Sequence, residues 1–389
     1  MAAAVLDDEL LREVLLRLPT AADLLRAALA CRPFLHAARH AHFLRRFRAL
    51  QPSPRLLLGF LFLVPDDSLS PPFFLSAADA PDDEGWAADY SLSFLPGVGA
   101  WPAAAWTLLD CRDGHSLLQN RYSDEIAVAD PLSRAYLVLP ALDPTAGRAV
   151  GYGLVVDDGD DDCDWAFRVV CVARDRGSSA TLRAMILSSN ELRWDEVGDL
   201  TCVADLAASK AMHGSNGSLY WRLNHGARML ALGLGDASAA PEEAMEFSVI
   251  NLPPSFSGLS YDVVENGDGA GVGLIHLLAM RDYRIERWVA APASGAGALT
   301  WRLLDTSLRF YRALESMLFG AGELREQALA IIGVVDGVVF VRQCGALLSI
   351  DLETMKLTRL SEEDCSDALI YPYAKPRAWP PSFLKPAAP

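Results

Sequence analysis

The sequence predicts an α+β multidomain protein. A small helical domain is expected over residues 1–50, a mainly-β, propeller-like repeat domain of about six blades over residues 55–375, and a Pro-rich tail over residues 376–389. Three observations support this division. Apolar residues recur at helical spacing before residue 50, short apolar runs broken by Gly, Asp, Asn and Pro follow it, and the turn signals among those runs repeat along the chain.

The first helix is expected in LDDELLREVLLRLP, residues 6–19. Asp7 and Asp8 can cap its N-terminal end. Residues at steps of three and four share one helical face, and this apolar face contains Leu10, Leu11, Val14, Leu15 and Leu18. Pro19 has no amide hydrogen to continue the helix, so the helix is expected to end there.

Two or three further short helices are expected before residue 50. Thr20 and Asp23 resemble a capping box, and Leu24 and Leu25 begin a second apolar stripe. Pro33 suits the first turn of a third helix, which Phe34 continues. So small a unit buries little surface by itself, so a partner or the adjoining domain is expected to cover its remaining apolar face.

These residues carry a resemblance to a known family. The segment from Leu6 to about Leu50 resembles an F-box, the module that docks onto the Skp-type adaptor of cullin–RING ubiquitin ligases. The matching positions are Leu6, Asp8, Leu10, Glu13, Val14, Leu15, Leu18, Pro19, Leu24, Cys31 and the segment Phe43–Phe47. Asp7 stands where the family commonly has Pro, and Phe34 stands where it commonly has Trp.

The resemblance implies a function and a set of contact residues. The chain is expected to be the substrate-recognition subunit of a Skp–cullin–F-box ubiquitin ligase, binding the adaptor, and through it a cullin, by its helices. The β-rich domain is expected to bind a client protein, and no catalytic role is expected for the chain itself. The residues expected to bind the adaptor are Leu6, Leu10, Val14, Leu15, Leu18, Pro19, Leu24, Leu25 and Phe34.

Composition narrows the class of protein. The net charge of −16 argues against nucleic acid as a partner, because a phosphate-binding surface needs concentrated Lys and Arg. Seven scattered cysteines without a Cys-x-x-Cys spacing favour buried thiols in a reducing compartment. The first residues lack the features of a signal peptide, and the apolar runs are too short or interrupted for a membrane span. An intracellular protein of the cytoplasm, the nucleus or both is therefore expected.

The β-rich part alternates two kinds of strand group. One kind begins with a hairpin signal, because both residues of Asp-Gly and Asn-Gly tolerate positive φ, and the pairs are Asp113-Gly114, Asn216-Gly217 and Asp336-Gly337. The other kind has a tryptophan near its end, at Trp106, Trp194 and Trp301. Repeats of about 40–50 residues that are built from several strands predict propeller blades. The segment 306–330 breaks the rhythm and predicts a helical insertion. The combination resembles plant-type F-box proteins with a propeller-like associated region.

No motif points to a catalytic, cofactor or metal site. The acidic run Asp157–Trp165 lacks the spacing of a calcium loop, and His36 and His40 have no further ligands nearby. Asp130 and Asp351 occupy matching places and are expected to form turns.

Two alternatives remain open at this stage. The chain could bind the adaptor without delivering a client for degradation. It could also be a propeller enzyme with an accidental helical extension, which requires several acids and a histidine converging on one channel mouth.

Overall fold

The structure is a computed structural model. It describes residues 8–18, 21–38, 43, 46–47, 50, 57–63, 73–76, 89–96, 105–156, 166–178, 180–201, 210–214, 218–223, 228–233, 246–264, 274–292, 299–307, 310–318, 329–335, 337–343, 345–360 and 369–374.

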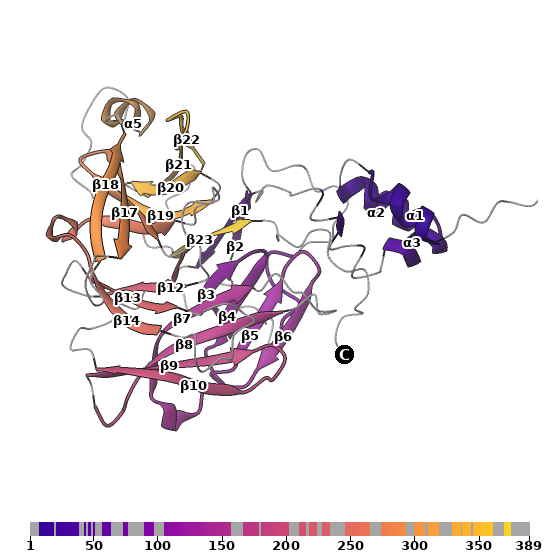
Figure 1. Ribbon diagram of the computed structural model, residues 1–389, viewed down its shortest axis with the longest axis horizontal. Helices are drawn as coiled ribbons and strands as arrows, with labels where there is room; N and C mark the ends of the chain where they lie inside the picture. The colour runs from indigo at the N-terminus through magenta and orange to yellow at the C-terminus, as the bar shows by residue number, and fades with distance from the viewer. Residues whose placement is uncertain are drawn as a thin grey trace, which may run out of the picture.

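Three helices of the N-terminal unit have described bounds: α1 (Asp8–Leu15), α2 (Ala21–Ala30) and α3 (Arg32–Ala38). Buried side chains of these helices, together with Phe43 and Phe47 from the segment after α3, make a core of their own, consisting of Leu11, Leu15, Leu16, Leu24, Ala28, Ala37, Ala38, Phe43 and Phe47. Figure 1 shows the three helices grouped at one side of the β-strands. The described helices agree with the first three of the three or four short helices expected from sequence.

Six antiparallel sheets, here called blades 1 to 6 in ring order, follow the helices. Blade 1 has three strands, β2 (Phe73–Ser76), β1 (Leu57–Leu63) and β23 (Leu369–Ala374). Blade 2 contains β3 (Trp106–Arg112), β4 (His115–Asn120), β5 (Ile126–Asp130) and β6 (Ala135–Leu139). Blade 3 contains β7 (Arg148–Val156), β8 (Phe167–Arg174), β9 (Thr181–Ser188) and β10 (Trp194–Thr201).

The last three blades repeat the four-stranded order. Blade 4 contains β11 (Met212–His213), β12 (Leu219–Arg222), β13 (Arg228–Gly233) and β14 (Glu246–Asn251). Blade 5 contains β15 (Ser260–Val264), β16 (Ile275–Arg281), β17 (Arg284–Pro292) and β18 (Leu299–Thr306). Blade 6 contains β19 (Ala330–Val335), β20 (Val338–Gln343), β21 (Ala346–Asp351) and β22 (Leu357–Arg359).

The six blades close into a ring. Each of six hydrophobic clusters lies chiefly between two neighbouring blades, from blades 1 and 2 round to blades 6 and 1. The inner strands β23, β3 and β7 contact one another in turn, as do β11, β15, β19 and β23. A strand packed on both faces can be apolar throughout, which explains the continuous burial of β1 and β5. The fold is therefore a six-bladed β-propeller, which confirms the predicted blade number.

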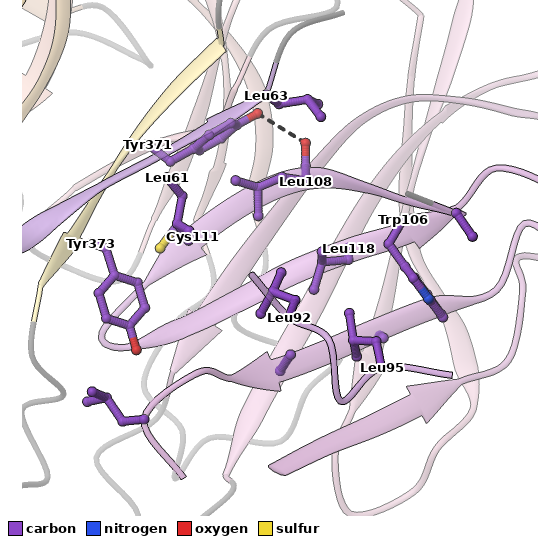
Figure 2. Packing of buried hydrophobic residues seen from close by; sticks show 14 of the residues in the cluster. Leu61, Leu63, Leu92, Leu95, Trp106, Leu108, Cys111, Leu118, Tyr371 and Tyr373 are labelled. Atoms are coloured by element: carbon purple, nitrogen blue, oxygen red, sulfur yellow. Dashed lines mark hydrogen bonds between the residues drawn. The ribbon is translucent and has the colours of Figure 1, made fainter. Parts of the chain in front are cut away.

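The C-terminal strand β23 closes blade 1, where it is the inner strand beside β1. Tyr373 is fully buried and donates a hydrogen bond to the Gly114 carbonyl of blade 2 at 2.9 Å. Tyr371 donates to the Leu108 carbonyl at 3.4 Å. Figure 2 shows both tyrosines beside Leu61, Leu108 and Cys111 in this interface. The two ends of the propeller domain are thus held together by a shared sheet and by buried aromatic rings.

The predicted hairpin turns are confirmed in blades 2 and 6, where their residues are described. Asp113 and Gly114 have φ of +44° and +78°, as a type I′ turn between β3 and β4 requires. Gly337, between β19 and β20, has the same φ of +78°. The alternation of two kinds of blade stays a prediction, because the turn predicted in blade 4 is not described. Asn216, Gly217 and Asp336 lie outside the described residues.

The structure confirms the predicted turns and the helical insertion, and it corrects the position of one tryptophan. Asp130 and Asp351 accept backbone hydrogen bonds two residues ahead, so both form turns as expected. The insertion before blade 6 contains α5 (Tyr311–Leu318), also as expected. Trp194 and Trp301 occupy outer strands β10 and β18, but Trp106 begins the inner strand β3 of blade 2, so its assignment to the end of the preceding unit was wrong. A local pattern could not show that blade 1 takes its third described strand from the C-terminus.

We expect Gly337→Val to destabilise the propeller by about 1–3 kcal/mol, because a β-branched residue is strained at positive φ. The cost is conformational, since a Cβ at Gly337 meets nothing within 4 Å. Gly198→Val is the matched control: its Cβ also meets nothing within 4 Å, and it lacks the left-handed φ. Thermal unfolding and limited proteolysis measure both variants. If Gly337→Val only loosens blade 6 while blades 2 to 4 keep full protection, the ring is not one cooperative unit.

Candidate functional site

The outer face of α1 is the first candidate site. Leu10 is 58% exposed and Val14 is 55% exposed, and their spacing of four residues places them on one side of the helix. Leu11 and Leu15, one residue further along, are buried in the core of the helical unit. The apolar stripe of α1 is therefore wider than the unit can cover, and its outer half faces solvent.

The structure divides the residues expected to bind the adaptor. Leu10 and Val14 are exposed, whereas Leu15 and Leu24 lie inside the helical core. Leu18 and Phe34 are half-buried against that core. Leu6, Pro19 and the side chain of Leu25 lie outside the described residues. In this packing Leu15 and Leu24 support the helices, and the surface open to a partner is that of Leu10 and Val14.

Charged side chains border this face. Arg17 is exposed one turn beyond Val14, and Glu13 forms an ion pair with Arg46 from the end of the helical segment. That pair is exposed on both sides, so it contributes little to stability. It does hold residue 46 against α1, because the two partners are 33 residues apart in sequence.

The second candidate site lies where the inner strands meet at the propeller axis. Asp110 of β3 is completely buried, and its Oδ1 accepts a hydrogen bond from the Cys111 amide at 2.8 Å. Its Oδ2 accepts from the Leu154 amide of blade 3 at 2.9 Å and lies 3.0 Å from Nε2 of His213 in blade 4. One carboxylate thus joins three successive blades.

Lys210, just before β11, connects blade 4 to the other side of the ring. Its Nζ donates to the Ile332 carbonyl of blade 6 at 3.0 Å and lies 5.5 Å from the ring centroid of Tyr371 in blade 1. An ammonium group has three N–H donors, and this is the one hydrogen bond that Lys210 makes to the described part of the chain. Among the described residues, two of its donors have no acceptor.

Asp262 of β15 is a second buried carboxylate near the axis, 8% exposed. Its Oδ1 accepts from the Val263 amide at 2.9 Å. Burial raises the pKa of Asp262 above its ordinary 3.8, although Lys210 and Arg222 act in the opposite direction. Arg222 itself donates to the Tyr261 carbonyl and stacks on the Tyr261 ring at 4.8 Å.

Burial lowers the pKa of His213 below its ordinary 6.5, and the cations Arg112 and Lys210 add to this effect, whereas Asp110 opposes it. The imidazole is therefore neutral near pH 7. An ionised carboxylate only accepts hydrogen bonds, so the proton is assigned to Nε2, which donates to Asp110. His213 Nδ1 is then an acceptor, and it has no partner among the residues that the structure describes.

The lowered pKa of His213 predicts acid sensitivity. At pH values between the folded-state and unfolded-state pKa values of His213, the unfolded chain binds more protons than the folded chain. The free energy of unfolding therefore falls as the pH drops below about 6.5. His213→Gln can still donate to Asp110 but does not titrate. We expect the wild type to lose more free energy of unfolding than this variant between neutral pH and about pH 5, by about 1.4 kcal/mol per unit of pKa shift.

Urea unfolding at several pH values measures this difference. Asp262 contributes to the pH dependence with the opposite sign, because its raised pKa stabilises the folded state at low pH. Asp262 is present in both proteins, so its contribution cancels in the comparison. Equal pH dependence of the two proteins would contradict the assignment of a depressed His213 pKa.

Sequence reasoning missed the group of Asp110, Lys210, His213 and Asp262 at the propeller axis, here called the axial cluster. Asp110 and Asp262 lie within inner strands. The available signal was an aspartate inside an apolar run, in WTLLDCR and SYDVV, where a solvated position is not expected.

Among the described residues no group of three or more His, Cys, Asp or Glu side chains is arranged to hold a metal ion. In the same part of the chain no helix is long and apolar enough to cross a membrane.

Comparison with known proteins adds no family. No protein-family model matches the chain, and no curated protein matches it. Among solved structures, YCF48 from Cyanidioschyzon merolae is 8% identical, covers 79% of this chain and 88% of its own, and has a TM-score of 0.38. The WD40 domain of SCAP from fission yeast is 12% identical, covers 66% and 51%, and has a TM-score of 0.36.

A third similar structure is the PQQ-bound aldose sugar dehydrogenase from Streptomyces coelicolor, 12% identical, covering 69% of this chain and 83% of its own, with a TM-score of 0.34. These scores are too low to support an argument about function, and the fold rests on the strand pairings above. The chain is thus a six-bladed β-propeller protein with an N-terminal helical unit.

Proposed function

We propose that this protein is the substrate-recognition subunit of a Skp–cullin–F-box ubiquitin ligase. The observation that carries the proposal is the solvent-facing pair Leu10 and Val14 on a helical unit that has its own core. An amphipathic helix with apolar residues one turn apart is suited to an apolar groove on a partner. Complete burial of a Leu or Val side chain contributes about 1.5–3 kcal/mol, and a little over half of each side chain is still exposed, so the pair supplies about 2–3 kcal/mol toward a micromolar affinity.

The propeller supplies the surface for a client protein in this proposal. Leu57, where the propeller begins, pairs with Ala374, where it ends. Tyr373 bonds to Gly114, so both ends lie on the face of the ring that carries the β3–β4 hairpin. In the proposal the helical unit is attached on that face and the client binds the opposite face, which carries the 80% exposed Tyr122.

The chain itself performs no chemistry in this proposal. Its contribution is proximity, because a client held on the propeller has its lysines at high local concentration near the ubiquitin carrier. The partners are a Skp-type adaptor, a cullin bound through it, and a client protein. The complex acts inside the cell, in the cytoplasm, the nucleus or both.

Affinity purification of the tagged full chain, with and without a proteasome inhibitor, tests the proposal. We expect the adaptor and a cullin in both samples and a client enriched with the inhibitor. Recovery of the adaptor and cullin with no protein whose half-life changes would favour an adaptor-binding protein without a degraded client. Recovery of neither adaptor nor cullin would contradict the proposal.

The axial cluster favours one alternative, a propeller enzyme, because two carboxylates and a histidine do gather near one axis. Asp110 already accepts three hydrogen bonds, which leaves Asp262 as the carboxylate with capacity for a reacting group. Turnover of activated ester, lactone or glycoside substrates that disappears in Asp262→Asn would support this alternative. Turnover that is absent, or unchanged in the variant, would count against it.

A further inference from the structure

The axial cluster has unused hydrogen-bonding capacity. Asp262 Oδ2 accepts no hydrogen bond from the described part of the chain, although the residue is 8% exposed. Lys210 uses one of its three donors, and His213 Nδ1 is an acceptor without a described partner. None of these three atoms is among the fully enclosed, unpartnered side-chain atoms of the described residues, so water can reach them, and a ligand with matching polar groups would replace that water.

The unused atoms are of two kinds. Lys210 offers N–H donors, which suit an anionic oxygen, while Asp262 Oδ2 and His213 Nδ1 accept, which suits a group with several N–H donors. Lys210 and His213 are three residues apart, and the strand β11, which contains His213, contacts β15, which carries Asp262, so the three side chains come from adjacent parts of blades 4 and 5. They form no ion pair with each other, and solvent still reaches 12% of the His213 side chain.

Charge balance narrows the class of ligand. Ionised Asp110 and Asp262 are matched by Lys210 and Arg222, and Arg112, which also acts on His213, is paired with Asp113, so the cluster is close to neutral overall. A ligand with a net charge would leave a charge uncompensated in this buried place, which is costly. A neutral molecule with one anionic and one cationic group avoids that cost and matches both kinds of free atom.

We propose that the propeller axis binds a small zwitterion with the ammonium–carboxylate pair of an α-amino acid. The ligand carboxylate accepts from Lys210, and its ammonium group donates to Asp262 Oδ2 and His213 Nδ1. Because Lys210 also contacts blades 6 and 1 and His213 contacts blade 2, the bound molecule links the ring across its axis. This proposal is independent of the function proposed for the helical unit.

Calorimetric titration of the full chain tests this site. The probes are the common amino acids, with acetate and methylammonium as the separate halves and glycerol as an uncharged polyol. We expect at least one amino acid to bind with a millimolar Kd or tighter, and each half to bind at least tenfold more weakly. Absence of heat with every amino acid, or binding of acetate, methylammonium or glycerol as tight as the best amino acid, would overturn the proposal.

Variants locate the binding. Lys210→Met and Asp262→Asn are each expected to weaken binding of the amino acid at least tenfold. Lys356→Met is the matched control, because Lys356 is an exposed lysine in the β21–β22 turn, and this variant should bind as the wild type does. Near-ultraviolet circular dichroism checks that each variant is folded. Lys210→Arg keeps the charge and provides a second test if Lys210→Met unfolds, with a smaller loss expected. Binding that is unaffected in the folded variants would place the ligand elsewhere and contradict the site.

Discussion

Asp110→Ala is expected to lower the free energy of unfolding by about 3–5 kcal/mol. The substitution removes the acceptor for three donors, the amides of Cys111 and Leu154 and Nε2 of His213. Each buried donor that loses its acceptor keeps its desolvation cost without a compensating hydrogen bond. A loss of this size is a large part of the stability of an ordinary domain.

Urea unfolding followed by tryptophan fluorescence measures the effect. Asp195→Ala is the control, because Asp195 lies on the outer strand β10 and forms an exposed pair with Arg193, so its loss is expected to cost no more than about 0.5 kcal/mol. If Asp110→Ala costs about as little as this control, the axial carboxylate does not hold the blades together.

Leu10→Glu combined with Val14→Glu is expected to weaken adaptor binding at least about a hundredfold and to leave the fold unchanged. Both side chains are more than half exposed, so the free protein tolerates the carboxylates. In a closed apolar contact each unpaired carboxylate costs several kcal/mol, and about 1.4 kcal/mol is a tenfold change in affinity.

Surface plasmon resonance with immobilised adaptor measures the loss. Leu192→Glu is the matched control, because Leu192 is an exposed leucine at 42% in the β9–β10 turn of the propeller, and its variant should bind as the wild type does. Undiminished binding by the α1 double variant would show that the adaptor contacts a different surface.

The parts of the fold that sequence could predict are those that local chemistry decides. The hairpin at Asp113-Gly114 follows from the tolerance of both residues for positive φ, and α5 follows from a break in the strand rhythm. The blade number follows from counting repeated units. Each of these features depends on residues close together in the chain.

The closure of the ring could not be predicted in the same way. The pairing of β23 with β1 joins residues more than 300 positions apart, and nothing in LIYPYA names its partner. The axial site has a similar origin. The pairing of β3 with β4 has a β-bulge between Leu108 and Asp110, and a bulge changes the direction in which the following side chains point. Lys210, His213 and Asp262 become neighbours only when blades 4 and 5 take their places in the ring.

The helical unit shows a third limit. Periodicity placed Leu10, Leu11, Val14, Leu15 and Leu18 on one face, but it could not divide that face between the core and the solvent. The division is set by α2 and α3, which cover Leu11 and Leu15 and leave Leu10 and Val14 open. Whether a partner covers the open half is the central question for function.

Titration of the purified full-length chain with a purified Skp-type adaptor answers it most directly. The proposed function predicts a saturable one-to-one complex with a micromolar Kd or tighter. Absence of binding by a folded chain, at adaptor concentrations far above the micromolar range, would contradict the assignment of the helical unit as an adaptor-docking module.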